Sequence, residues 1–169
     1  PDASDAPMDG DIVFENVSFG YENSPELLHN ISFTVKSGST LGILGTTGSG
    51  KSTMMLLLDR LYDIEPGKGR ITIGGTDIKK IKTKHLRRNI GMVLQEPFLF
   101  SRTVFENIGI SDPSFTLDDI RRAAKAAALD DSITSFPKAY DTLIGERGVT
   151  LSGGQKQRTA IARTLTGNY

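Results

Sequence analysis

One stretch of the chain, residues 45–53, has residue types that suit the binding of phosphate groups. It reads Gly-Thr-Thr-Gly-Ser-Gly-Lys-Ser-Thr and fits G-x-x-x-x-G-K-[ST] without a mismatch. A nucleoside triphosphate presents several negative oxygens, so backbone N–H groups must surround it closely. Gly48 and Gly50 allow this because they carry no Cβ and take positive φ without strain. The candidate phosphate-binding residues are Gly45, Thr46, Thr47, Gly48, Ser49, Gly50, Lys51, Ser52 and Thr53.

The side chains at the end of this stretch match the remaining needs of a bound triphosphate. Lys51 would reach the β- and γ-phosphates, and the Ser52 hydroxyl would ligate Mg²⁺. A run of strand length, residues 40–44, precedes the loop, and a run with helical character, residues 54–58, follows it. The motif requires this order of strand, loop and helix. The sequence therefore predicts nucleotide binding.

The composition limits the classes to which the chain can belong. Its 169 residues, of which 37% are hydrophobic, suffice for one ordinary domain with a core. Basic and acidic residues number 20 each, and this balance argues against nucleic-acid binding through bulk charge. The lack of cysteine excludes a disulfide framework, a thiolate zinc site and a cysteine nucleophile. No apolar run approaches the ~18 residues needed to cross a bilayer.

The expected elements are those of an α/β protein. Residues 1–10 lack periodic apolar positions, and we interpret them as a linker or disordered lead-in. Alternating residues predict a strand with a bulge in residues 11–21 and a half-buried antiparallel strand in residues 31–35. Further strands are expected at residues 40–44, 70–73 and 90–94, and helices after residue 50, within 79–89, from 116 and within 156–165. In the last helix Ala160, Ile161 and Leu165 are expected to face inward.

A second glycine-rich turn begins at Leu151 and reads Leu-Ser-Gly-Gly-Gln. Ser152 and Gln155 form a capping box, which places Gly153 and Gly154 in the first turn of a helix. Each glycine costs roughly 1 kcal/mol relative to alanine inside a helix, so a structural cap alone does not explain both. Bare N–H groups at a helix start attract anions. Two copies arranged head to tail would each place this turn on the nucleotide held by the other copy.

Together the two motifs resemble those of nucleotide-binding domains of ATP-binding cassette (ABC) transporters. Residues 151–155 look like the signature motif of that family, at the distance from the phosphate-binding stretch that the family shows. The similarity covers nearly all of residues 11–169. It implies a P-loop NTPase core of the α/β class with an antiparallel β subdomain, in residues 11–95, and a mainly helical signature subdomain, in residues 96–169. It also implies that residues 1–10 are a linker from a membrane domain.

The resemblance implies roles for individual residues. Tyr21 would stack on the adenine of ATP, and Gln95 would reach Mg²⁺ and the attacking water. Lys51 and Gln95 are thus the catalytic candidates, and Ser52 and Gln95 the metal ligands. The turn that would contact the ATP of a partner domain consists of Ser152, Gly153, Gly154 and Gln155. From the residues alone, Tyr21 could equally be a packing residue, and Gln95 a buried, hydrogen-bonded amide.

An exporter is implied by residues 96–108 and by residues 145–148, which resemble the loop that meets the coupling helices of exporters. In such proteins two nucleotide-binding domains close on two Mg·ATP and drive membrane domains between two states. We therefore expect ATP and Mg²⁺ as cofactors, and a second nucleotide-binding domain and transmembrane domains as partners, without nucleic acid. The expected location is the cytoplasmic face of a membrane.

Part of the family's pattern is unmatched. After Tyr169 a complete domain would continue with an apolar strand ending in the Walker B Asp, then a catalytic Glu and a switch His, so we expect the domain to be incomplete at its C-terminus. Asp59 follows an apolar run, but that run belongs to the helix after the phosphate loop. Loss of the carboxylate that positions water slows phosphoryl transfer by orders of magnitude. The sequence thus predicts that this chain binds ATP better than it hydrolyses it.

Two alternatives fit the same motifs. One is a regulatory half of a heterodimeric transporter, which binds ATP without hydrolysing it; the residue after the Walker B Asp would decide this. The other is a soluble ABC ATPase that is not linked to a membrane. The neutral charge and the exporter-like residues 145–148 weigh against the second alternative.

Overall fold

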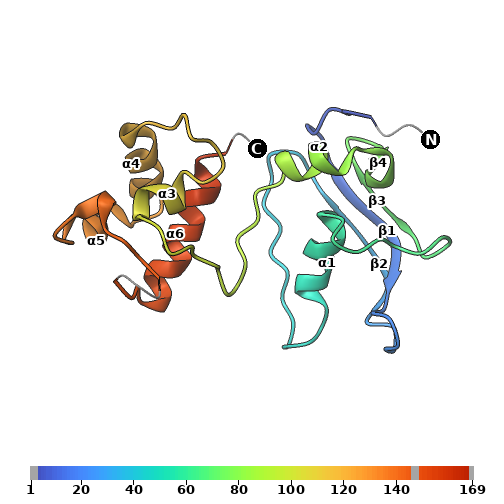
Figure 1. Ribbon diagram of the computed structural model, residues 1–169. Coiled ribbons are helices and arrows are strands. Elements are labelled where there is room, and N and C mark those ends of the chain that lie inside the picture. The colour runs from blue at the N-terminus through green and yellow to red at the C-terminus, as the bar shows by residue number, and fades with distance from the viewer. Residues whose placement is uncertain (1–3, 146–148, 168–169) are drawn as a thin grey trace. The chain divides into compact units, whose positions relative to one another are not determined.

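The computed structural model describes residues 4–145 and 149–167. The chain divides into two compact units between Ile90 and Gly91. The first unit contains the β-sheet and the second is helical, as Figure 1 shows. Each unit has a hydrophobic core of its own, so each can be described by itself.

The first unit is built on an antiparallel sheet with the strand order β2-β1-β3-β4. Its strands are β1 (Ile12–Phe19), β2 (Leu28–Val35), β3 (Arg70–Ile73) and β4 (Thr76–Asp77). Shifts of register after Phe14 and after Val17 confirm the bulge predicted in the first strand. Along the second half of β2, partly buried and exposed residues alternate as predicted, because one face of the strand packs against the core.

Short helical segments complete the first unit. They are α1 (Lys51–Leu58), the 3-10 helix η1 (Ile78–Lys80) and α2 (Thr83–Arg88). Where a single helix was predicted within residues 79–89 there are therefore two helical segments, and Ile81 between them is extended. Leu57 of α1, Ile71 of β3 and Leu86 of α2 belong to one buried cluster. This cluster joins the helical segments to the sheet.

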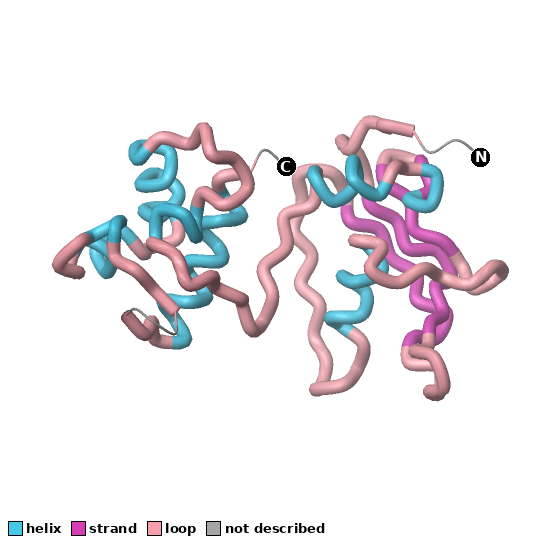
Figure 2. The backbone as a smooth tube through the Cα atoms, viewed as in Figure 1, coloured by secondary structure: helices cyan, strands magenta, loops and turns pink. Residues whose placement is uncertain are grey.

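Residues 40–44 and 90–94 do not form strands, contrary to the prediction. No described residue pairs with either segment, and both are drawn as loops in Figure 2. A strand requires a hydrogen-bonded neighbour, and an apolar run supplies side chains for burial but no such neighbour. The side chain of Leu44 is accordingly 97% exposed.

Residues 4–10 pack on the first unit, which corrects the expectation of a disordered lead-in. Ser4 forms a parallel bridge with Ile81. The Lys82 ammonium donates to the Asp5 carboxylate at 2.9 Å. Ala6 is buried in the apolar cluster of the unit and Met8 packs against it. Composition did not predict this docking, because two apolar residues and a few hydrogen bonds leave no periodic pattern in the sequence.

The second unit packs its helices around an apolar cluster that includes Ile108, Ile120 and Ile144. The helices are α3 (Val104–Ile108), α4 (Leu117–Ala126), α5 (Asp130–Thr134), the 3-10 helix η2 (Ala139–Asp141) and α6 (Gly153–Leu165). Thr116 and Asp119 form the capping box of α4, as predicted. Within residues 4–145 and 149–167, no helix is long and apolar enough to cross a membrane.

The inward face of α6 differs from the predicted one. Ala160 is buried as expected, but Ile161 is 37% and Leu165 51% exposed. Thr159 and Ala162 take the buried positions instead. Their small side chains let α6 pack closely on α3 and α4.

Candidate nucleotide site

The predicted phosphate-binding stretch forms an exposed loop and the start of a helix. Residues 45–49 are exposed, and α1 begins at Lys51 with Gly50 as its N-cap. Among the described residues no side chain caps α1, and its first turn contains no acidic residue. Its first N–H groups and its positive end therefore meet no competing side-chain acceptor. Such a helix start suits an anion.

Two glycines of this loop have backbone conformations that favour glycine. The φ angles are 81° at Gly48 and 89° at Gly50. A Cβ added at Gly50 would lie 2.5 Å from Cδ2 of Leu28, whereas one added at Gly48 would meet nothing within 4 Å. Gly50 is therefore required by conformation and by packing. Gly48 leaves open space in which a phosphate group can approach the backbone.

The Lys51 side chain folds back along the loop. Its Nζ donates to the carbonyl oxygen of Gly45 at 2.8 Å and to that of Thr46 at 2.6 Å. Phosphate oxygens are stronger acceptors for an ammonium group than carbonyls are. Ser52 is exposed in the same turn, and one hydroxyl together with phosphate oxygens is a ligand set that Mg²⁺ accepts. The residues of this loop thus fit a triphosphate with its Mg²⁺.

Tyr21 is joined to α1 through its hydroxyl group. Its Oη lies 3.0 Å from Oγ1 of the buried Thr53. The ring meets Phe19 and Tyr62 edge to face, with centroids 5.2 Å and 5.1 Å away. These contacts fix the plane of the Tyr21 ring. The structure therefore brings the predicted base-stacking residue and the helix after the predicted phosphate-binding loop together in one unit.

A cavity of about 590 Å³ lies beside Tyr21. Its acidic lining residues are Glu22, Glu26, Asp63 and Glu65. The Lys68 ammonium donates to Glu26 at 2.8 Å and lowers the pKa of that carboxyl below its usual value. The negative rim disfavours phosphate groups, and the uncharged parts of a nucleotide, its base and ribose, fit better there. Sequence motifs did not reveal this cavity, because its lining comes from separate segments.

The second glycine-rich turn is the N-terminus of α6, as predicted. The Gln155 N–H donates to Oγ of Ser152 at 3.2 Å, and the Ser152 N–H donates to Oε1 of Gln155 at 2.9 Å. Gly153 and Gly154 are exposed, and a Cβ added at Gly153 would meet nothing within 4 Å. The turn therefore presents bare backbone on the surface of the second unit.

Gln95 lies in the second unit and shares a cavity of about 440 Å³ with this turn. The lining residues are Gln95, Glu96, Pro97, Gly153, Lys156 and Gln157. The Gln157 side-chain amide donates to the Gln95 carbonyl. Gln95 is exposed, so it is not the buried amide that the residue type alone suggests. The sequence motifs did not reveal the role of Gln157, which lies 62 positions away.

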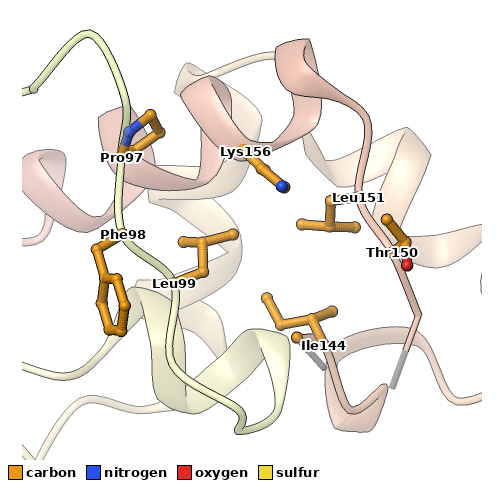
Figure 3. A pocket seen from close by; sticks show the side chains of 8 residues that line it. Pro97, Phe98, Leu99, Ile144, Thr150, Leu151 and Lys156 are labelled. Atoms are coloured by element: carbon orange, nitrogen blue, oxygen red, sulfur yellow. The ribbon is translucent and has the colours of Figure 1, made fainter. Parts of the chain in front are cut away.

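An apolar pocket of about 370 Å³ lies next to this cavity on the second unit. Figure 3 shows Leu99, Ile144 and Leu151 pointing into it, with the Lys156 amine at its edge. Phe98 on its wall is 69% exposed. Sequence reasoning missed the pocket, because residues from separate segments line it and only Leu151 among them belongs to a glycine-rich motif.

The predicted coupling loop is described at its first residue. Gly145 has a φ of 106° and lines the apolar pocket. A Cβ added to it would lie 2.8 Å from Oγ of Ser101. The remaining positions, 146–148, lie outside the described residues, so the prediction for this loop stays a prediction.

The comparisons with known proteins agree with this geometry. The sequence profile described as ABC transporter matches residues 28–169. The chain belongs to the ABC transporter family. The family consists of ATP-hydrolysing transporters, and the recognition made from the two glycine-rich motifs is confirmed.

Similar proteins carry names of exporters. This ABC transporter chain is 50% identical over 160 residues to the "Putative multidrug export ATP-binding/permease protein YgaD" of Bacillus subtilis (strain 168), covering 94% of the chain and 27% of that protein. It is 49% identical over 156 residues to the "Beta-(1-->2)glucan export ATP-binding/permease protein NdvA" of Rhizobium etli, covering 92% and 26%. The chain thus spans about a quarter of the length of these relatives.

A solved structure shares the fold. The "Structure of a bacterial Atm1-family ABC exporter with ATP bound" has a TM-score of 0.92 and 44% identity, and the match covers 99% of this chain and 30% of that one. The predicted α/β class, with a P-loop NTPase core, an antiparallel β subdomain and a helical subdomain, is therefore confirmed at the level of the fold.

Proposed function

We propose that this ABC transporter chain is the ATP-binding part of an exporter, in which ATP binding and hydrolysis drive transport through membrane domains. The phosphate loop carries the proposal, because its open backbone at Gly48 lies beside the start of α1 and the Lys51 ammonium. The neighbouring Tyr21 cavity is of the size that small-molecule ligands occupy. The names of the relatives support export as the use of this binding.

We propose for the individual residues the roles that the motif and the family resemblance imply. Lys51 holds the β- and γ-phosphates, and Ser52 and Gln95 are the side chains that would hold Mg²⁺. When bound, Mg²⁺ neutralises charge on the phosphates. Tyr21 stacks on adenine and orients the nucleotide. Gln95 holds the attacking water in position.

The proposed partner at the signature turn is a second nucleotide-binding domain. The exposed N-terminus of α6 suits the phosphates of a nucleotide that the partner domain binds. This turn consists of Ser152, Gly153, Gly154 and Gln155. A head-to-tail pair gives each nucleotide one loop and one turn.

The proposed partner at the apolar pocket is a transmembrane domain on the cytoplasmic face of the membrane. The exposed Phe98 and the apolar walls formed by Leu99, Ile144 and Leu151 suit a hydrophobic anchor. Residues 1–10 are the proposed connection to that membrane domain. Lys156 lines both the apolar pocket and the cavity beside the signature turn.

We expect the 169-residue chain by itself to bind ATP far better than it hydrolyses it. Fast hydrolysis needs a group that positions water and a carboxylate that polarises it. Among residues 4–145 and 149–167 we assign no carboxylate to this role. A turnover rate typical of ABC transporters in the isolated chain would contradict this expectation.

Equilibrium titration with ATP and Mg²⁺ tests the proposed function. Lys51→Ala should weaken ATP binding by about 100-fold or more, because an ammonium that bonds charged oxygens is lost. Lys84→Ala changes an exposed lysine of α2 in the same unit and is the matched control. ATP affinity that is equal in Lys51→Ala and in the unchanged chain would refute the assignment of the phosphate loop.

A further inference from the structure

Residues 95–103 of the second unit are held in place by side chains rather than by regular structure. Asn107 of α3 is fully buried. Its Nδ2 donates to the carbonyls of Phe100 at 2.9 Å and Thr103 at 3.0 Å, and its Oδ1 accepts the Phe100 N–H at 2.8 Å. Both polar ends of the amide are therefore committed to the segment that follows Gln95.

Arg163 connects this segment to α6. Its Nε donates to the Asn107 carbonyl at 2.8 Å, Nη1 to the Phe98 carbonyl at 3.0 Å and Nη2 to Oδ1 of Asn107 at 3.3 Å. Its guanidinium carbon lies 5.8 Å from the centroid of the Phe100 ring. Burial lowers the pKa of Arg163 from its ordinary value. Only the planar fork of arginine can serve these acceptors at once, because a lysine offers a single point charge.

The same helix holds the other end of the segment through Gln157, whose amide donates to the Gln95 carbonyl. Helix α6 begins at the signature turn, next to the cavity that Gln95 lines. Thus α6 contacts the segment at Gln95 and again at Phe98, and Figure 1 shows the segment running beside the helix within the second unit.

We propose that Arg163 and Gln157 are positioning residues for the hydrolysis of ATP: they fix Gln95 relative to the signature turn at the start of α6. Neither residue is assigned a contact with the nucleotide. Their effect on the rate comes through the position of Gln95, and the inference therefore rests on the proposed function. It adds two positions of α6, beyond the motifs, to the residues that set the rate.

Steady-state kinetics of the full-length protein test this inference. Arg163→Lys keeps the charge and loses the fork, and Gln157→Glu keeps the size and loses the amide donor. Each should lower kcat about 10- to 100-fold, because a small displacement of a positioning group costs that much. KM and the affinity for a non-hydrolysable ATP analogue should stay within about twofold, because the phosphate loop lies in the other unit.

A background without the glutamine separates positioning from stability. In Gln95→Ala, the substitutions Arg163→Lys and Gln157→Glu should cause no further loss of kcat, because the group they position is absent. A purely structural role would lower kcat by the same factor in both backgrounds, and that result would overturn the inference. Arg122→Lys in α4, whose side chain is 77% exposed, is the control and should leave kcat unchanged.

The inference and the proposed function fail in different ways. If the unchanged protein hydrolyses ATP and both α6 variants match it, the inference is wrong and the proposed function stands. If the unchanged protein neither binds nor hydrolyses ATP, the proposed function is wrong and the inference falls with it.

Discussion

Tyr21 shows how a single side chain can be tested for base stacking. Tyr21→Ala removes the ring and should weaken ATP binding by about 10- to 100-fold, since stacking on an aromatic ring contributes about 1–3 kcal/mol. Tyr21→Phe keeps the ring and loses the hydrogen bond to Thr53. It should therefore weaken ATP binding by about 1 kcal/mol, or about fivefold. Calorimetric titration with ATP and with tripolyphosphate, which has no base, measures both effects. If Tyr21→Ala weakened the binding of tripolyphosphate as much as that of ATP, the stacking role would be contradicted.

Glycines of equal backbone conformation can separate folding from binding at the phosphate loop. Gly48 and Gly67 both have a φ of 81°, and an added Cβ meets nothing within 4 Å at either. Changing either to alanine should cost about 1–2 kcal/mol of unfolding free energy, but Gly48→Ala alone should weaken ATP binding. Gly50→Ala should cost more, about 2–5 kcal/mol, because its Cβ also overlaps Leu28. Urea unfolding and ATP titration of the three variants measure both quantities. If Gly48→Ala and Gly67→Ala bound ATP equally well, the loop would have a structural role only.

At the scale of the helices, two capping boxes of the second unit offer a matched pair. Ser152 caps α6 and Thr116 caps α4 through the same pair of hydrogen bonds. Ser152→Ala and Thr116→Ala should each cost about 1 kcal/mol of unfolding free energy. Only Ser152→Ala should also slow ATP hydrolysis in the full-length protein, because only its turn is assigned to a nucleotide. Equal rates in the two variants would refute that assignment.

The contact between α5 and η2 predicts a dependence of stability on pH. Asp130 accepts the Tyr140 hydroxyl at 2.7 Å and Arg121 Nε at 3.2 Å, and these bonds, the tyrosine first, hold the pKa of Asp130 below 3.8. Because the folded pKa is lowered, the stabilisation is complete above about pH 4 and is lost as the pH falls through the folded value. Tyr140→Phe should therefore cost about 1.5–3 kcal/mol of unfolding free energy at pH 7 and less once the pH falls below the folded pKa of Asp130.

Urea unfolding of the chain and of Tyr140→Phe across this range measures the difference. Tyr62→Phe is the control, because Tyr62 is 44% exposed and its ring makes the aromatic contacts of the first unit. If Tyr140→Phe lowered the unfolding free energy by the same amount at every pH in this range, the ionisation of Asp130 would not be the cause of the loss.

Local patterns predicted the elements whose cause is local. The bulge of β1 and the caps at Thr116 and Ser152 depend on neighbouring residues, and the structure has them. The strands predicted at 40–44 and 90–94 are absent from the described residues, because pairing depends on a partner that an apolar run does not specify. Motifs likewise predict a phosphate loop from neighbouring residues, but they do not predict the hydrogen bonds of Arg163, whose acceptor at Phe98 lies 65 positions away.

At the scale of the whole molecule, the two separate cores predict two unfolding steps. The phosphate loop and Tyr21 belong to the first unit, and the second has an apolar cluster of its own. ATP without Mg²⁺, at 100 times its Kd, should therefore stabilise the first unit by about 2.7 kcal/mol and leave the second unchanged, because Gln95 then has no metal ion to hold. Hydrogen exchange resolves the units, since amides of β1 and β3 should gain protection and those of α4 and α6 should not. Equal gains in all four elements would mean that the chain unfolds as one cooperative body.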